Sequence, residues 1–211
     1  IPTLYFAEGL PNIIVTALAV FMYMQMGLSD ADVALYSGWL CLPWVLKPLW
    51  SPFIDILKTK RWWIFTMQML IGGALAGIAF TLPTAFWFQG TMFFFFSMAF
   101  ASATHDIAAD GYYMLMLDEH NQTKYVGLRN TFYRLAVVFV NAGLAKVADK
   151  LETYFHMSVV YTWTLVFYGL AGLFICIWLY HSRVMPRSKD DVAIEKKASD
   201  IARELKLMFV T

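Results

Sequence analysis

The chain has 211 residues, of which 60% are hydrophobic and 15% charged, with a formal net charge of +1 and a mean hydropathy of +0.57. A soluble domain carries roughly 45–50% apolar and about 25% charged residues, and one of this length could not bury so large an apolar excess in a single core. The composition therefore excludes an ordinary soluble domain, and the near-neutral charge gives no indication of a nucleic-acid partner.

Apolar stretches of membrane-spanning length recur along the chain. A helix needs about 20 mostly apolar residues to cross about 30 Å of hydrocarbon. Six stretches meet this requirement, at residues 4–26, 32–54, 62–82, 86–117, 125–148 and 159–180. They lack the alternating polarity of barrel strands. We therefore predict an all-α membrane protein, with a six-helix transmembrane bundle over residues 1–182.

The first two predicted spans carry charge within apolar sequence. In the first, Glu8 is followed by Gly9 and Pro11. Such a pattern occurs in the broken helices that line transporter cavities, although a simple proline kink is the alternative. The second span contains Lys47 and ends near Asp55. A basic loop then leads to the third span, with Lys58, Lys60 and Arg61.

The fourth span contains His105, Asp106 and Asp110. The two aspartates lie four residues apart and so share one face of a helix. Because two carboxylates on one face repel each other, we expect a cation beside them, either Arg134 in the fifth span or Lys47. His105 with the aspartates could also bind a metal, but a hard metal site needs more ligands than the spans offer. We therefore predict no metal and no other cofactor.

After the sixth span, a charged tail over residues 183–211 forms a separate element. Its apolar residues recur at spacings of three and four, namely Ile194, Ala198, Ile201, Leu205 and Met208. This pattern predicts a cytoplasmic amphipathic helix on the membrane or against a bundle, with a solvated linker as the alternative. The chain starts without an initiator methionine and ends in apolar residues, so we expect it to be part of a longer protein.

Positive charge sets the expected orientation. Lys and Arg residues are concentrated in the loop after the second span, near the loop after the fourth span, and in the tail. Cytoplasmic loops of membrane proteins carry this excess. We therefore predict a multi-pass protein whose N-terminus and tail are both cytoplasmic.

Charged side chains inside the predicted spans are the candidates for function. A charge near the bilayer centre is costly unless it is paired or wetted. Counted along their helices, these side chains gather in the cytoplasmic half of four spans. We expect them to bind substrate or couple protons, whereas an ion-pair cluster that only fixes helix packing is the alternative. They are Glu8, Lys47, His105, Asp106, Asp110 and Arg134.

Four motifs resemble one branch of a known transporter superfamily. They are YFAEGLP at residues 5–11, LPWVLKPLWSPFID at 42–55, ATHDIAADG at 103–111 and YRL at 133–135. Together they resemble the muropeptide permease and acetyl-CoA transporter branch of the major facilitator superfamily, although His105 stands where that branch more often has glutamine. The stretch from Asp55 to Arg61 also resembles part of the loop motif between helices 2 and 3 of that superfamily.

The resemblance implies the N-terminal half of a secondary transporter in a bacterial inner membrane. Two six-helix halves would move a large anionic solute, such as a muropeptide, by alternating access and proton symport. The resemblance assigns Lys47 and Arg134 to the solute, and Glu8, Asp106 and Asp110 to proton coupling. It implies three partners, which are the lipid bilayer, the solute and the C-terminal half. It also implies a cytoplasmic gating loop, made of Asp55, Lys58, Lys60 and Arg61.

Two other functions compete with this interpretation. An intramembrane enzyme would use Asp106, Asp110 and His105, but it needs a nucleophile or a complete metal set at the same cavity, and the spans supply neither. A stand-alone six-helix channel or scaffold would need no second half. We predict a transporter and not an enzyme.

Overall fold

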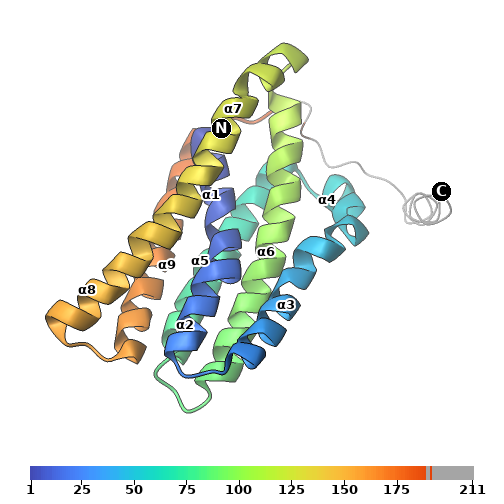
Figure 1. Cartoon of the computed structure of the whole chain (residues 1–211). Helices are drawn as coiled ribbons and strands as arrows, with labels where there is room; N and C mark the ends of the chain where they lie inside the picture. The colour runs from blue at the N-terminus through green and yellow to red at the C-terminus, as the bar shows by residue number, and fades with distance from the viewer. Residues whose placement is uncertain (189–190, 192–211) are drawn as a thin grey trace.

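The described part of the chain is helical throughout. The computed structural model describes residues 1–188 and 191, and every regular element in that part is a helix (Figure 1). The amphipathic helix predicted for the tail lies outside the described residues, as does the side chain of Asp55.

Several of the helical elements join end to end to form two long rods. α1, η1 and α2 form one continuous rod, and so do α7, η3 and α8, with a π-helical turn in the middle of each rod. The bounds in chain order are α1 Pro2–Ile13, η1 Ile14–Leu18, α2 Ala19–Gln25, α3 Asp30–Leu46, η2 Lys47–Leu49, α4 Ser51–Leu57, α5 Lys60–Thr81, α6 Trp87–Met116, α7 Glu119–Val138, η3 Phe139–Leu144, α8 Ala145–Phe155 and α9 Val159–Val184.

Five helices in the described residues are long and apolar enough to cross a membrane. They are Pro2–Gln25, Lys60–Thr81, Trp87–Met116, Glu119–Phe155 and Val159–Val184. The sequence predicted six spans, and the second of these is the one that is not a single helix of spanning length. There, α3 has 17 residues, and the 3-10 turn η2 separates it from α4. Proline cannot donate a backbone hydrogen bond, and this segment contains Pro43, Pro48 and Pro52.

Side-chain caps fix where three of the helices begin. Ser29 accepts a hydrogen bond from the backbone N–H of Asp32 at the start of α3, and Thr59 accepts one from Trp62 at the start of α5. Asp118 caps α7 in the same way. An N-cap side chain satisfies an N–H group that the helix itself leaves unpaired. The cap at Asp118 starts α7 six residues before the predicted position, since that span was expected at 125–148.

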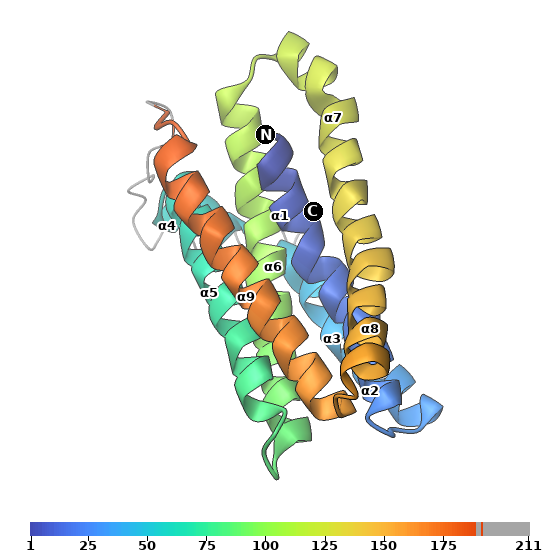
Figure 2. The ribbon, with the colours of Figure 1, turned by 90° about the vertical axis from the view of Figure 1, so that its left-hand side faces the viewer.

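The helices are arranged around α1 and α6. In Figure 1, α3 lies on one side of this central pair and the α7–α8 rod on the other, while α5 and α9 lie behind. Figure 2, turned by 90°, shows α5 and α9 together on one side and the α7–α8 rod on the other. The apolar core includes the buried rings of Phe95, Trp163 and Phe167, and Phe95 meets Phe167 edge-on at 5.6 Å. The front of α1 and α6 therefore lies between two flanking helices.

Candidate functional site

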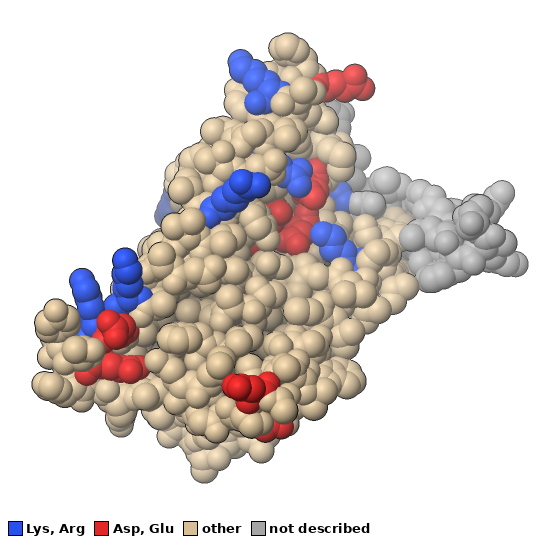
Figure 3. Space-filling model, viewed as in Figure 1, with Lys and Arg blue, Asp and Glu red and all other residues tan. Residues whose placement is uncertain are grey.

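Charged side chains from four helical segments meet on the front of the bundle. Figure 3 shows acidic side chains gathered between basic ones in the upper part of this surface, and the surface below them is mostly uncharged. The segments that supply them are α1, η2, α6 and α7. We call the group the charged face, and its members are Glu8, Lys47, Asp106, Asp110 and Arg129.

One ion pair joins the broken α3–α4 segment to α6. Lys47 Nζ lies 3.7 Å from Asp106 Oδ2, and the two side chains are 34% and 14% exposed. The segment is anchored on α6 by Trp50, whose indole Nε1 donates to Thr104 Oγ1 at 3.2 Å. The Trp50 ring also stacks on Phe100 at 4.6 Å. The proline-rich break thus positions a lysine over an aspartate of another helix.

Asp110 contacts both α1 and α7. Its Oδ1 atom accepts the hydroxyl of Tyr5 at 3.0 Å and lies 3.0 Å from Arg129 Nη2. The Arg129 guanidinium also lies over the rings of Tyr5 and Tyr113, at 4.5 and 5.7 Å from the ring centres. Such ring contacts stabilise a cation without a counter-charge. One carboxylate and one arginine therefore join α1, α6 and α7.

The sequence predicted a cation beside the two aspartates, either Arg134 or Lys47, and the structure places Lys47 beside Asp106 but a different arginine beside Asp110. The sequence interpretation favoured Arg134, but Arg129 makes the ion pair, and Arg134 is exposed without an ion pair to any residue that the structure describes. Positions five residues apart differ by about 140° around a helix, so the two arginines point in different directions. Arg129 was missed because the predicted span began at Tyr125 and left it beside the loop, whereas α7 begins at Glu119.

Glu8 is the most buried member of the charged face. The residue is 7% exposed, and its Oε2 atom has no hydrogen-bond partner among the described residues. Gly9 brings α1 close to α7, since a Cβ there would lie 3.0 Å from both Tyr133 O and Ala136 Cβ. Glu8 is also within electrostatic reach of the two aspartates. A buried polar atom without a protein partner is suited to hold a proton or a ligand atom.

His105 lies on the other side of α6. It is fully buried, and its Nε2 atom lies 3.1 Å from Gln68 Nε2. Gln68 also hydrogen-bonds His181 Nδ1 at 2.9 Å, and His181 Nε2 lies 3.0 Å from Thr3 Oγ1. We call these four residues the buried polar chain, which joins α1, α5, α6 and α9. The sequence interpretation missed Gln68 and His181, although a glutamine within an apolar span was a visible signal.

The position of His105 bears on the enzyme alternative. His105 is hydrogen-bonded to Gln68, whereas the two aspartates contact Lys47 and Arg129. Within residues 1–188 and 191, no group of three or more His, Cys, Asp or Glu side chains is placed to hold a metal ion.

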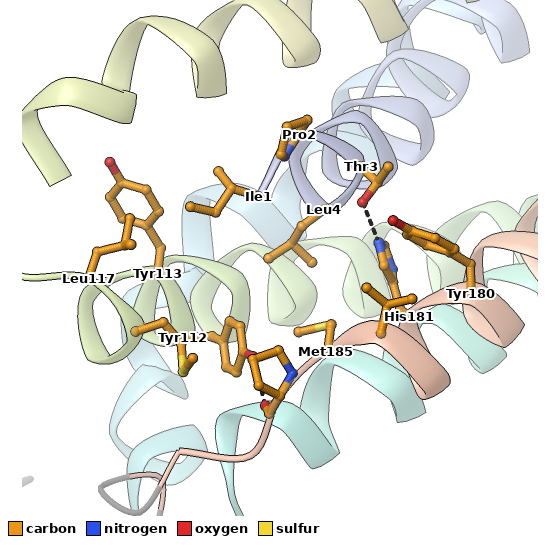
Figure 4. A pocket seen from close by; sticks show the side chains of 13 residues that line it. Ile1, Pro2, Thr3, Leu4, Tyr112, Tyr113, Leu117, Tyr180, His181 and Met185 are labelled. Carbon is orange, nitrogen blue, oxygen red and sulfur yellow. Dashed lines mark hydrogen bonds between the residues drawn. The ribbon is translucent and has the colours of Figure 1, made fainter. Parts of the chain in front are cut away.

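A cavity of 370 Å³ lies beside the buried polar chain, between α1, α6 and α9 (Figure 4). On its wall, Thr3 and His181 hydrogen-bond each other, and the Tyr112 hydroxyl donates to the carbonyl of Pro186 at 2.8 Å. These polar groups are thus already paired with protein atoms. The charged face, with its partly exposed ion pairs, is the better candidate for a solute site.

The predicted gating residues contact the end of α9. Arg61 donates from Nε and Nη2 to carbonyl oxygens there, at 3.1 and 3.2 Å. The backbone N–H groups of Lys60 and Arg61, at the start of α5, donate to the Asp191 carboxylate at 2.7 and 3.1 Å. Lys58 is exposed. Lys60 and Arg61 therefore bind the segment that follows α9.

A comparison with models of known protein families assigns the chain to one of them. The family model described as the BT1 family matches residues 8–130, which is more than half of the chain. The chain belongs to the BT1 family. This is a family of membrane transporters related to the major facilitator superfamily. The matched stretch begins at Glu8 and includes Lys47, Asp106, Asp110 and Arg129, so it contains every member of the charged face.

Curated relatives of this BT1 family chain are much longer than the chain itself. An uncharacterized protein of Schizosaccharomyces pombe is 25% identical over 199 residues, and one of Haemophilus influenzae is 29% identical over 185 residues. An uncharacterized membrane protein of Saccharomyces cerevisiae is 22% identical over 178 residues. The alignments take in 83%, 82% and 70% of this chain but 38%, 40% and 32% of those relatives. This multi-pass membrane chain thus spans about two fifths or less of the relatives' length.

Proposed function

We propose that this chain is the N-terminal half of a secondary transporter that moves a large anionic solute by alternating access, coupled to protons. The observation that carries the proposal is the charged face, where α1, η2, α6 and α7 bring two ion pairs and a buried carboxylate together. Membership of a transporter family supports the same class of function. The solute and the coupling ion are inferences from the chemistry of this face.

The exposure of the ion pairs argues against a purely structural role. The Lys47 side chain is 34% exposed, and those of Arg129 and Asp110 are 31% and 35% exposed. Charged side chains in membrane spans almost always face the bundle interior or a water-filled cavity, even when they are paired. In a membrane this surface must face water or another part of the protein. A second half that closes over the charged face, with a water-filled path between the two, meets this requirement.

The broken α3–α4 segment completes a six-span half in this proposal. α3, η2 and α4 together cover residues 30–57, which is long enough to cross hydrocarbon although the helix is interrupted. Interrupted helices in transporters line solute sites, and the break here places Lys47 on the charged face. In this proposal the end that carries Ile1 faces the cytoplasm of a bacterial inner membrane, because Lys and Arg residues are concentrated in the loops and tail at that end.

The roles follow from the contacts of each side chain. Lys47 and Arg129 are the cations that attract the solute. The exposed Arg134 is a third cation with the same role. Glu8 is the carboxylate that carries the coupling proton, since it is the most buried and has an oxygen without a protein partner in the described part. The sequence resemblance points to muropeptides and acyl-CoA as solutes, and both are large anions.

Transport by the full-length protein tests the proposal. We expect liposomes containing it to take up a muropeptide or acetyl-CoA when a proton gradient is applied, with protons moving in the same direction. Asp106→Asn and Asp110→Asn should each reduce uptake at least a hundredfold, because each removes the partner of a cation on the charged face. Asp149→Asn, in the exposed part of α8, is the matched control. Normal uptake by both variants would refute the proposal.

A further inference from the structure

A second cavity opens beside the charged face, between the end of α6 and the start of α7. Its volume is 660 Å³, within the range of about 300–1,000 Å³ typical of small-molecule sites. Its lining contains charges of both signs, and it includes two members of the charged face. The lining residues are Asp110, Tyr113, Met114, Glu119, Gln122, Thr123, Val126 and Arg129.

Most polar side chains of the lining are committed to the protein itself. Gln122 Nε2 donates to the carbonyls of Met114 and Leu117, at 3.2 and 2.7 Å, and so caps the end of α6. Thr123 Oγ1 donates to Glu119 O at 3.0 Å. The charged groups of Arg129, Asp110 and Glu119 are what the cavity has left to offer a ligand.

Arg129 has binding capacity beyond its ion pair. A guanidinium carries five N–H donors in a planar fork that suits a carboxylate. The ion pair with Asp110 joins only Nη2 to Oδ1, and the Tyr5 and Tyr113 rings hold the guanidinium without using its N–H groups. Asp110 therefore positions Arg129, and the remaining edge of the fork can receive a second carboxylate.

The acids of the lining exclude a simple anion site. Asp110 and Glu119 would repel a ligand that carries only negative charge, because like charges at a few ångströms are unfavourable. Glu119 is exposed at the start of α7 and has no hydrogen-bond donor from the described side chains. A ligand with a carboxylate and an ammonium group satisfies Arg129 and Glu119 at once.

We propose that this cavity binds the zwitterionic, amino-acid-like end of the solute, with its carboxylate on Arg129 and its ammonium group on Glu119. The proposal rests on the proposed function, and it narrows the solute from any large anion to one with a free amine beside a free carboxylate. A peptide-bearing muropeptide has this chemistry, whereas acetyl-CoA lacks the amine.

Binding by the purified full-length protein tests the assignment through matched ligands and variants. The probes are a muropeptide that ends in diaminopimelate, its amine-acetylated form and its carboxyl-amidated form, measured by calorimetry. The wild type should bind the unmodified probe at least tenfold more tightly than either blocked form. Arg129→Gln should weaken binding of the unmodified probe at least tenfold. This variant should also bind the unmodified and amidated probes equally well. Glu119→Gln should instead lose the discrimination against the acetylated form.

Three further variants separate binding from folding. Arg129→Lys keeps the charge but not the fork, so it should fall between the wild type and Arg129→Gln. Lys124→Gln removes a cation of the same helix that does not line the cavity, and Asp149→Asn removes an acid from the other end of the rod. Both controls should bind all probes within twofold of the wild type.

The two proposals fail in different ways. Equal binding of the three probes by the wild type, no binding at all, or unchanged discrimination in Arg129→Gln would overturn the zwitterion site. Selective binding without uptake in a proton gradient would support the zwitterion site and count against the transport function. Proton-driven uptake that treats the three probes alike would support the transport function and overturn the zwitterion site.

Discussion

The charged face and the buried polar chain lie on different sides of α6, although Asp106 and His105 are neighbours in sequence. Adjacent residues point about 100° apart around a helix, so one side chain reaches Lys47 and the other reaches Gln68. On the charged face all the groups are ionisable, and all except the buried Glu8 are partly exposed and joined by ion pairs. In the buried polar chain they are two imidazoles, an amide and a hydroxyl.

Neutral groups alone can form the hydrogen bonds that run from Thr3 to His105 in the buried polar chain, although His105 Nδ1 has no partner among the described residues. In one consistent assignment Thr3 donates to His181 Nε2, His181 Nδ1 donates to Gln68 Oε1, and Gln68 Nε2 donates to His105 Nε2. Neutral hydrogen bonds between helices hold a membrane bundle together without any charge in the hydrocarbon. Polar residues in the spans therefore fall into two sets that differ in charge: we infer that the neutral buried polar chain fixes packing, and the proposed function places the solute on the charged face.

The largest expected effect comes from the charged face. Lys47→Gln should reduce uptake at least tenfold, because Asp106 then loses its ion-pair partner and the solute loses a cation. The free energy of unfolding should change by less than about 1 kcal/mol, since the pair is partly exposed. Lys146→Gln in α8, at the other end of the bundle, serves as the control. A variant that unfolds but transports normally while folded would assign Lys47 to packing.

Gln68→Leu should produce the opposite result. It leaves His105 Nε2 and His181 Nδ1 without their shared partner, and an orphaned buried group costs about 1–3 kcal/mol. Thermal unfolding in detergent should show this loss, while uptake per folded molecule stays within twofold of the wild type. Met69→Leu changes the exposed neighbour and should alter neither quantity. Loss of uptake at unchanged stability would remove the distinction between the two regions.

Composition and spacing predicted much of the bundle and part of the site. The apolar stretches placed five of the helices, and the four-residue spacing of Asp106 and Asp110 correctly put both on one side of α6. The broken helix was missed because a hydropathy count treats a proline in an apolar run as neutral. Pro48 nevertheless interrupts the backbone hydrogen bonds of the helix, and a hydropathy scale does not include this effect.

The partners of the charged groups required packing that spacing alone does not contain. Whether Arg129 or Arg134 faces α6 depends on where α7 begins and how closely it approaches α1 at Gly9. Gln68 and His181 are 113 residues apart in the chain, and no local pattern links them. Periodicity identifies the face of one helix, but the facing side chain is chosen by the arrangement of the others.

The smallest expected effect on uptake and stability is that of substituting His105. This substitution is also the most direct test of the difference between the charged face and the buried polar chain. His105→Gln keeps a hydrogen-bonding group next to Gln68, so the free energy of unfolding should change by less than about 1 kcal/mol and uptake should remain near the wild-type level. Asp106→Asn changes the adjacent residue and should abolish uptake. If the two variants were equally inactive and equally stable, the side of α6 on which a residue lies would not decide its role, and the buried polar chain would belong to the transport mechanism.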